Sequence, residues 1–204
     1  MKAVFLDRDG VLNDLALNPA TGAWESPHAI DEIRIAAGAP AALADLASAG
    51  FALFIVSNQP SYAKGKISLD ALREIATHIE DRFRSEGIAF TETFYCLHHP
   101  AGIVPEVSGP CACRKPSPWF LLAAADRHDI DLAASWMVGD RDTDIACGSS
   151  AGCRTILIAN PRSAAHQGTD EPTSTAASIG DAARIILTAG SGSRRRESSE
   201  GGTG

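Results

Sequence analysis

The stretch Val4-Phe5-Leu6-Asp7-Arg8-Asp9-Gly10-Val11-Leu12-Asn13 begins as an apolar run and reaches two carboxylates that are followed at once by a glycine. The apolar run predicts a buried strand. Side chains two residues apart on a strand point to the same side, so Asp7 and Asp9 can face one cavity if the strand geometry persists. Two carboxylates at that distance repel each other unless a cation or a proton lies between them. Because Asp-Gly is also ordinary turn chemistry, the rest of the chain must distinguish a functional site from an acidic turn.

Composition indicates one folded domain. The chain has 204 residues, of which 45% are hydrophobic and 21% are charged, as expected for a globular domain with a sizeable core. A net charge of −7 argues against a partner that is a nucleic acid or an anionic membrane, because binding their phosphates needs a basic face. The apolar start is too short for a signal peptide, and no segment approaches the length of a membrane span. We therefore expect a cytoplasmic protein.

Predicted strands and helices alternate along the chain. After the first strand, apolar runs predict further strands at 51–56, 90–95, 136–138 and 155–158. Helical spacing and capping residues predict helices at 40–48, 69–85, 119–128, 142–150 and 177–188. This alternation predicts an α/β fold in which an open parallel sheet is flanked by helices.

The connections are too small to form a second domain. A long loop at 14–35 has no clean period and is expected to be functional; Trp24 in it could line a pocket, although we favour a role in fixing the loop to the surface. The segments before and after Ser57 have no room for a separate cap domain. We therefore predict a single domain at 1–189. Residues 190–204 are rich in glycine and serine and have no apolar side chain, so we expect a disordered tail there.

Polar residues gather at the predicted carboxyl ends of the strands. Ser57 follows the second strand, and Asp140 and Asp144 follow the fourth. Ligands bind at this edge of open α/β sheets, and unpaired carboxylates there are costly for stability. Acidic groups of this kind suit Mg²⁺, and Lys115 supplies a positive charge. Together with Asp7, such a set could attack a phosphate and form an aspartyl-phosphate.

A second constellation has the spacing of a metal site. Cys96-Leu97-His98 is separated by twelve residues from Cys111-Ala112-Cys113. Two close pairs joined by a loop can form a tetrahedral site for Zn²⁺ with the ligands Cys96, His98, Cys111 and Cys113; the alternative, three unrelated thiols and a histidine, is much less expected at this spacing. With four protein ligands the zinc would be structural. It would hold the loop at 96–113 and thereby place Lys115.

The motifs in this order resemble those of the haloacid dehalogenase (HAD) phosphohydrolase superfamily from residue 3 to about residue 158. They are 7–11, Ser57, Lys115 and 139–144. The resemblance implies a Rossmann-like fold in which Asp7 is the nucleophile and Asp9 the general acid/base. It further implies that Ser57 and Lys115 hold the phosphoryl group. The implied ligands of the catalytic Mg²⁺ are Asp7, the backbone carbonyl of Asp9, and Asp140, with Asp144 beside them.

The loop at 96–113, called the zinc loop below, limits the resemblance to fewer families within this superfamily. Cys-x-His-His-Pro followed by Cys-x-Cys-Arg-Lys-Pro is similar to the D-glycero-D-manno-heptose 1,7-bisphosphate 7-phosphatase family and to the related histidinol-phosphate phosphatases. The resemblance implies that the substrate is a small phosphorylated sugar or metabolite. It also implies four substrate-binding residues, which are Asn58, Gln59, Arg114 and Arg141. The segment 60–65 and the long loop at 14–28 depart from the family pattern where the substrate would be recognised.

Several functions remain open at this point. We favour Mg²⁺-dependent removal of the 7-phosphate of heptose bisphosphate. The enzyme alternative is histidinol-phosphate phosphatase. An alternative of another class is a zinc-stabilised binding module without catalysis, which is disfavoured because every catalytic position is filled. A phosphatase acting on nucleic-acid ends is disfavoured by the acidic charge.

Overall fold

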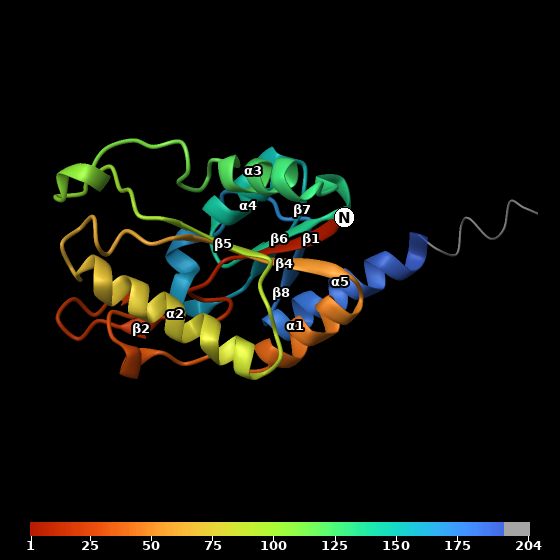
Figure 1. Cartoon of the computed structure of the whole chain (residues 1–204), viewed down its shortest axis with the longest axis horizontal. Coiled ribbons are helices and arrows are strands. Elements are labelled where there is room, and N and C mark those ends of the chain that lie inside the picture. The colour runs from red at the N-terminus through yellow and green to blue at the C-terminus, as the bar shows by residue number, and fades with distance from the viewer. Residues whose placement is uncertain (194–204) are drawn as a thin grey trace, which may run out of the picture.

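A computed structural model describes residues 1–193, through which a six-stranded parallel sheet runs (Figure 1). Its strands are β1 (Lys2–Leu6), β4 (Phe51–Asn58), β5 (Glu92–Cys96), β6 (Trp136–Gly139), β7 (Arg154–Ile158) and β8 (Ser174–Ala176). They lie in the order β5-β4-β1-β6-β7-β8, and every pairing is parallel. The predicted parallel sheet is confirmed. The chain builds outward from β1 to β5 and then crosses back to β6, so the switch in strand order falls beside β1.

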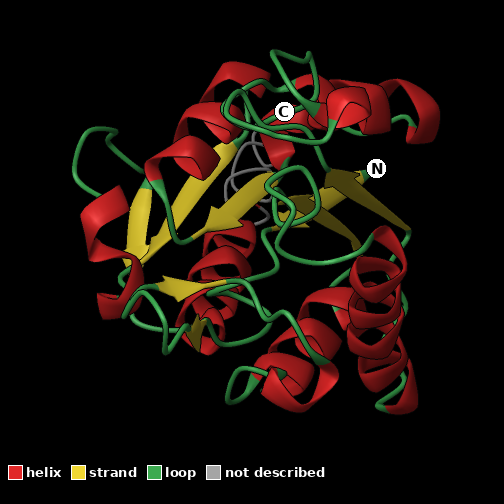
Figure 2. Ribbon diagram, turned by 90° about the vertical axis from the view of Figure 1, so that its left-hand side faces the viewer, coloured by secondary structure: helices red, strands yellow, loops and turns green. Residues whose placement is uncertain are grey.

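Helices cover both faces of this sheet (Figures 1 and 2). One face is covered by α1 (Ala39–Ser48), α2 (Leu69–Ser85) and α5 (Ile179–Ser193), and the other by α3 (Trp119–His128) and α4 (Asp142–Ala151). Along β1, Val4 and Leu6 pack into the first layer, whereas Phe5 packs into the second. Because both faces are buried, the strands read as continuous apolar runs in the sequence.

The predicted elements differ from the structure at several places. The edge strand β8 was not predicted, because its three residues contain no apolar run. Strand β5 begins at Glu92 instead of residue 90, since Phe90 packs edge-on against Phe83 of α2 with 5.5 Å between ring centroids. Helix α5 continues to Ser193, beyond the predicted domain end at 189. The remainder of the predicted tail, 194–204, lies outside the described residues.

The long loop that follows β1 contains regular structure. Strands β2 (Ala16–Leu17) and β3 (Trp24–Glu25) pair antiparallel and form a small hairpin, which precedes a 3₁₀ turn at Ile30–Glu32. Further 3₁₀ turns are Pro105–Val107, Leu132–Ala134 and Pro161–His166. Within residues 1–193 no connection between these elements is large enough to form a cap domain.

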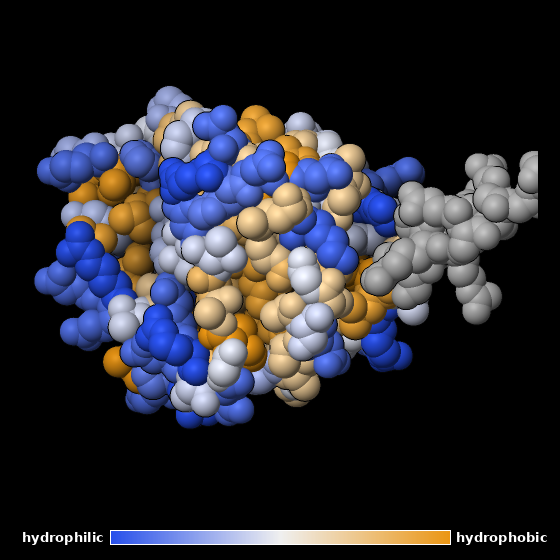
Figure 3. Space-filling model, turned by 45° about the vertical axis from the view of Figure 1, so that its right-hand side comes forward, coloured by the Kyte–Doolittle hydropathy of each residue, from blue (hydrophilic) through white to orange (hydrophobic). Residues whose placement is uncertain are grey.

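On the face shown in Figure 3, apolar residues gather near the centre and polar residues border them. Folded proteins routinely expose some apolar surface. Among the helices of residues 1–193, none combines the length and the apolar character needed to cross a bilayer.

Candidate active site

A cleft of about 570 Å³ opens at the carboxyl ends of the central strands. It lies at the switch in strand order, where open α/β sheets bind ligands. Eight residues singled out from the sequence line it, and these are Asp7, Asp9, Ser57, Asn58, Arg114, Lys115, Arg141 and Asp144. The structure therefore brings together residues that lie up to 137 positions apart in the chain (7 to 144).

Lys115 lies among the buried charged side chains at the carboxyl ends of the central strands, which we call the floor of the cleft. Its ammonium is 2.9 Å from Asp7 Oδ1 and 2.6 Å from Asp144 Oδ1, and it donates to the Val56 carbonyl at 2.7 Å. Burial by itself would lower the pKa of Lys115, but the charges of Asp144 and Asp7 raise it well above the ordinary value. The side chain is therefore a fixed cation beside the predicted nucleophile, as stabilisation of a phosphoryl group requires.

Asp140 is a buried carboxylate without a compensating partner. The residue is 0% exposed, and neither carboxylate oxygen accepts a hydrogen bond within the described part of the chain. The nearest cation, Arg141 Nε, is 3.9 Å from Asp140 Oδ1. Burial raises the pKa of Asp140 to about 8, helped by the negative charges of Asp7 and Asp144. A buried carboxylate of this kind is stable in its ionised form only when a cation lies beside it.

The donor set around Asp140 fits Mg²⁺. One carboxylate oxygen from each of Asp7, Asp140 and Asp144 can be chosen so that all three lie within 4.8 Å of one another. Hard oxygen ligands of this kind are those that Mg²⁺ prefers. Asp144 already pairs with Lys115, and its Oδ2 accepts from the N–H of Arg141 at 3.0 Å. Asp7 and Asp140 are therefore the carboxylates best placed to hold the ion.

Two glycines allow the carboxylates to approach this closely. Gly10 has φ +88°, and a Cβ at this position would lie 2.2 Å from Asp140 Oδ2. A Cβ on Gly139 would lie 2.1 Å from the Cβ of Asp144. Contacts of that length are impossible for a side chain, so the Asp-Gly and Gly-Asp pairs of the sequence have a steric role in this site as well as a turn role.

Asp9 is held by a network of buried donors. Arg8, which is 1% exposed, donates to both oxygens of Asp9 at 3.0 and 2.9 Å. Asn13 Nδ2 donates to Oδ1 at 3.0 Å, and Gln59 Nε2 donates to Oδ2 at 2.6 Å. Burial alone would raise the pKa of Asp9, but the Arg8 charge and these hydrogen bonds lower it below its ordinary value. The orientation of Asp9 is thus fixed by its neighbours.

The two amides that follow Ser57 make their contacts within the protein. Asn58 Nδ2 donates to Lys115 O at 3.1 Å, and Asn58 Oδ1 accepts from Lys115 N at 3.0 Å. Gln59 is buried, does not line the cleft, and bonds Asp9, Arg8 and Ser57 Oγ. In the structure Asn58 therefore holds Lys115, and Gln59 holds Asp9. Contact of either amide with a substrate stays a prediction.

The rim of the cleft contains residues that the sequence analysis did not select. Trp24 lines the cleft and packs under Arg162, whose guanidinium is 4.4 Å from the ring centroid, so both expectations for Trp24 hold. The lining side chains that could not be picked out from the sequence include Glu25, Ser26, Lys64, Lys66, His99 and His166. The departures from the family pattern at 60–65 and in the long loop at 14–28 were the sequence signals for this rim.

The predicted zinc ligands lie together. The Sγ atom of Cys113 is 3.1 Å from that of Cys96 and 3.6 Å from that of Cys111, and it is 3.9 Å from His98 Nδ1. A tetrahedral Zn²⁺ with metal–sulfur bonds of about 2.3 Å separates its ligands by about 3.8 Å. The four groups fit such a site, and His99, which was not predicted as a ligand, lines the cleft instead.

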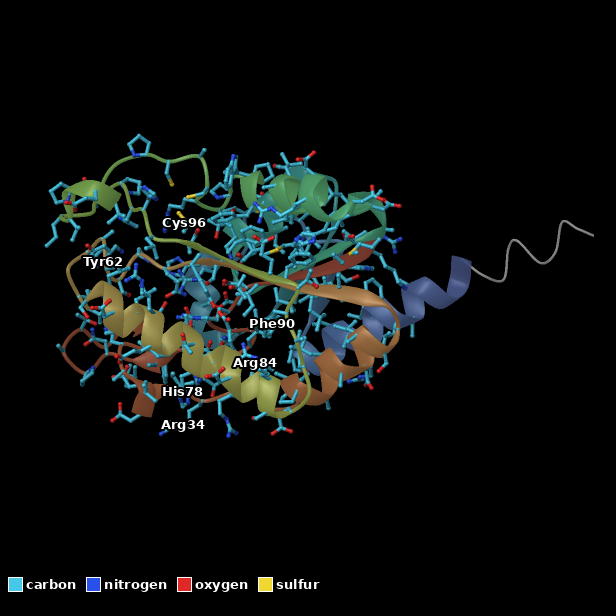
Figure 4. The ribbon with its side chains drawn as sticks, in the orientation of Figure 1. Arg34, Tyr62, His78, Arg84, Phe90 and Cys96 are labelled. Carbon is cyan, nitrogen blue, oxygen red and sulfur yellow. The ribbon has the colours of Figure 1, made fainter. Side chains whose placement is uncertain are left out.

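The zinc loop is joined to the cleft at two points. Cys113 is followed directly by Arg114, whose Nη1 donates to His98 O at 3.1 Å, and then by Lys115. Earlier in the zinc loop, the N–H of Ile103 donates to the carbonyl of Ala63, in the loop after β4, at 2.7 Å. Tyr62 in that loop and Cys96 lie toward the same end of the molecule (Figure 4). Order in the zinc loop therefore affects both sides of the cleft.

Comparisons with known proteins agree with this site. The family model HAD-hydrolase-like matches residues 112–182. The D-glycero-alpha-D-manno-heptose-1,7-bisphosphate 7-phosphatase of Photorhabdus laumondii is 31% identical over 86% of this chain and 90% of that protein. The corresponding beta enzyme of Escherichia coli is 36% identical over 76% of this chain and 78% of that protein.

The chain belongs to the heptose-1,7-bisphosphate 7-phosphatase family. A crystal structure of the D,D-heptose 1,7-bisphosphate phosphatase of B. bronchiseptica, complexed with magnesium and phosphate, is 29% identical in sequence. It superposes with a TM-score of 0.76 and covers 93% of this chain and 99% of that one. Membership in this family confirms the predicted HAD-like fold, the predicted phosphatase class and the family resemblance.

Proposed function

We propose that this member of the family removes the 7-phosphate of D-glycero-D-manno-heptose 1,7-bisphosphate through an aspartyl-phosphate on Asp7. The observation that carries the proposal is the buried floor of the cleft. There Asp7 lies 2.9 Å from the Lys115 ammonium, next to the buried carboxylate of Asp140, which accepts no hydrogen bond within the described residues. The named relatives act on heptose bisphosphate, and they supply the sugar in this proposal.

The first step is phosphoryl transfer to the chain. An Asp7 oxygen attacks phosphorus, the bond from phosphorus to the sugar oxygen breaks, and that oxygen takes a proton from Asp9. Lys115 lies where it can neutralise charge on the transferring group, and Ser57 offers a hydroxyl donor from the same floor. In the second step water attacks phosphorus and gives its proton to Asp9, while the bond from phosphorus to the Asp7 oxygen breaks and releases inorganic phosphate and the Asp7 carboxylate.

The surroundings of Asp9 suit both halves of this role. With its pKa held below the ordinary value, Asp9 is ionised in the free site and can accept a proton from water. An incoming phosphate brings negative charge, which raises the pKa of a nearby carboxylate and so favours the protonated form needed for the leaving group. Arg8, Asn13 and Gln59 keep its direction constant between the two steps.

Two metal ions complete the proposal. Asp7, Asp140 and the backbone carbonyl of Asp9 would hold Mg²⁺, which when bound supplies charge neutralisation for the phosphoryl oxygens. Cys96, His98, Cys111 and Cys113 would hold a structural Zn²⁺. The absence of a nucleic-acid partner and the cytoplasmic location stay predictions of the sequence.

The positive charge at the rim of the cleft favours heptose bisphosphate over histidinol phosphate as the substrate. Lys64, Lys66, Arg114 and Arg141 all line the cleft. Histidinol phosphate carries an amine that is protonated at neutral pH. Lys64 and Arg114, which form no ion pair within the described part of the chain, would repel that amine and attract a second phosphate. The arrangement therefore favours a bisphosphate. The non-catalytic alternative is disfavoured because it leaves the buried, unpartnered Asp140 without a role.

The test is a direct comparison of substrates. Purified protein with added Mg²⁺ is assayed for phosphate release from heptose 1,7-bisphosphate in both anomers and from histidinol phosphate. We expect the bisphosphate to have the higher kcat/KM. A higher kcat/KM for histidinol phosphate would overturn the proposed substrate, and no release from any phosphate monoester would overturn the enzyme assignment.

A further inference from the structure

The segment 160–169, which follows β7 and which we call the β7 loop, lies against the strand end that carries Asp140. It contains the 3₁₀ turn Pro161–His166, and His166 lines the cleft. Asn160 caps this turn, because its Oδ1 accepts from the N–H of Arg162 at 3.0 Å. None of these residues belongs to a motif of the catalytic site, so the role of the β7 loop must come from its contacts.

Gln167 in the β7 loop joins the carboxyl ends of β6 and β7. The pairing of these two strands ends at Gly139 and Leu157. Directly beyond it, Gln167 Nε2 donates to Asp140 O at 2.7 Å and to Ile158 O at 2.9 Å. A carboxamide nitrogen has two hydrogens, so one side chain can serve a carbonyl from each strand. Gln167 thereby replaces the ladder hydrogen bonds at the point where the strand pairing stops.

The Gln167 side chain is held on both sides by the rest of the β7 loop. The buried Ser163 Oγ lies 3.2 Å from Gln167 Nε2. The next two residues, Gly168 and Thr169, each donate a backbone N–H to the carboxylate of Asp142 at 3.0 Å. The β7 loop is therefore attached to the first residue of α4 immediately after Gln167, which fixes where the amide starts.

Asp140 needs such a contact because the sheet holds it on one side only. It is the first residue after β6, and its carboxylate accepts no hydrogen bond within the described residues. The strand fixes the backbone before Asp140, and the amide of Gln167 fixes the carbonyl after it. With both sides of the Cα held, the direction of the Cβ is set, and with it the starting point of the carboxylate. Because Asp140 is 0% exposed, water cannot replace the donor that Gln167 supplies.

We infer that Gln167 is a positioning residue for Asp140, which directs that carboxylate toward Mg²⁺ by holding its backbone. The inference rests on the proposed function, in which Asp140 is a ligand of the ion. Gln167 does not line the cleft, so its effect on the reaction must pass through Asp140. Removing a partner that orients a metal ligand typically weakens metal binding by about ten- to a hundredfold.

The experiment measures Mg²⁺ binding without substrate. Protein is purified without a chelator in magnesium-free buffer, so that zinc is retained, and it is titrated with MgCl₂ in a calorimeter. Gln167→Met keeps the length of the side chain and removes both N–H donors. We expect the Kd for Mg²⁺ to rise about tenfold in this variant.

Kinetics separate positioning from a loss of stability. With heptose 1,7-bisphosphate as substrate, the half-saturating Mg²⁺ concentration of Gln167→Met should rise by the same factor as the Kd. At saturating Mg²⁺ the kcat should stay within about threefold of wild type. A purely structural role would lower Tm and leave the Kd for Mg²⁺ unchanged.

A second variant and a matched control complete the series. Gln167→Asn keeps the amide but shortens its reach, so its Kd should also exceed that of wild type; this variant carries the test if Gln167→Met does not fold. Thr169→Val removes a hydroxyl that donates to Asp142 at 2.7 Å and leaves the contact with Asp140 in place. Its Kd should stay within about twofold of wild type.

The outcomes distinguish the role of Gln167 from the proposed substrate. A Kd for Mg²⁺ that is unchanged in the Gln167 variants, or raised equally in Thr169→Val, would overturn the positioning role. Wild type that binds no Mg²⁺ would overturn both that role and the metal site. If Mg²⁺ binding depends on Gln167 but heptose bisphosphate is not hydrolysed, the proposed substrate is wrong and the positioning role stands.

Discussion

The floor of the cleft and its rim are built in opposite ways. The floor consists of side chains at the ends of central strands and of Lys115, and Asp140, Asp144 and Lys115 are 0%, 1% and 3% exposed. The rim consists of loops and the β2–β3 hairpin, where Trp24 is 39% exposed. Burial makes each floor charge depend on an opposite charge nearby, whereas rim charges are screened by water.

Because of this difference in burial, we expect the floor to act in catalysis and the rim to act in the choice of substrate. The floor can stabilise charge strongly, because it is dry and its groups cannot reorient. The rim can change without unfolding the protein, because its interactions are individually weak. We therefore expect substitutions in the floor to reduce kcat and those in the rim to change which substrate is preferred. The following predictions test that division, from the largest expected effect to the smallest.

Replacing Asp7 by asparagine should remove turnover almost completely. An amide is not a competent nucleophile for phosphorus, so we expect kcat to fall more than about a thousandfold. The fold should persist, because residue 7 lies after the end of β1 and leaves the sheet pairing unchanged. The measurement is phosphate release, with circular dichroism melting as the control for folding. Full activity in Asp7→Asn would contradict the mechanism.

Replacing Gly10 by alanine should damage the floor through sterics alone. The new Cβ would lie 2.2 Å from Asp140 Oδ2, so Asp140 must move. We expect at least about a hundredfold loss of kcat/KM and weaker binding of Mg²⁺. Gly22→Ala in the hairpin is the matched control, because Gly22 has φ +70° but nothing within 4 Å. It should lose stability through backbone strain and keep its activity; equal activity losses in the two variants would refute the steric argument.

Removal of zinc should reduce activity only in part. Elemental analysis is expected to find about one zinc per chain, because the four ligands close the site. Chelation followed by addition of Mg²⁺ alone should leave about a tenth of the activity, since Asn58 still holds Lys115 by two hydrogen bonds. Readdition of zinc should restore it. Freshly purified protein with no zinc would contradict the site.

Breaking the rim pair between Glu25 and Lys66 should have the smallest effect. Burial alone would raise the pKa of Glu25, but the contacts with Lys66 and Asn18 lower it below the ordinary value of 4.5. The pair therefore contributes stability above pH 4.5, and this contribution is lost as the pH falls through the lowered pKa of the folded state. We expect Glu25→Gln to lower Tm by about 1 to 3 °C at pH 7.

The pH series is the check on this last prediction. The difference in Tm between wild type and Glu25→Gln should shrink as the pH is lowered below 4.5. A difference that stays constant down to acid pH would show that the charge of Glu25 is not its cause. Asp31→Asn, which removes an exposed carboxylate of the same loop, serves as a control for general charge removal.

The floor could be predicted almost entirely from the sequence. Its residues follow apolar runs, and parallel strands must bring their carboxyl ends to one edge, so Asp7, Ser57 and Asp140 could be placed together. The zinc ligands could be predicted because their spacing is restrictive. The rim could not, since the contacts of Lys64 and Glu25 depend on how three insertions fold against one another, and exposed charges carry no periodic pattern.

The amino-acid sequence thus determined the parallel sheet, and it brought out the carboxylates of the cleft and the Cys/His cluster, because alternating apolar runs and short motifs encode them locally. Only the tertiary structure assigned partners to the polar side chains. It paired Gln59 with Asp9 and Asn58 with Lys115, and within the described residues it left both oxygens of the Asp140 carboxylate without a hydrogen-bond donor. A sequence specifies which groups are present, but the balance of burial and neighbouring charge at each group is set by the fold as a whole.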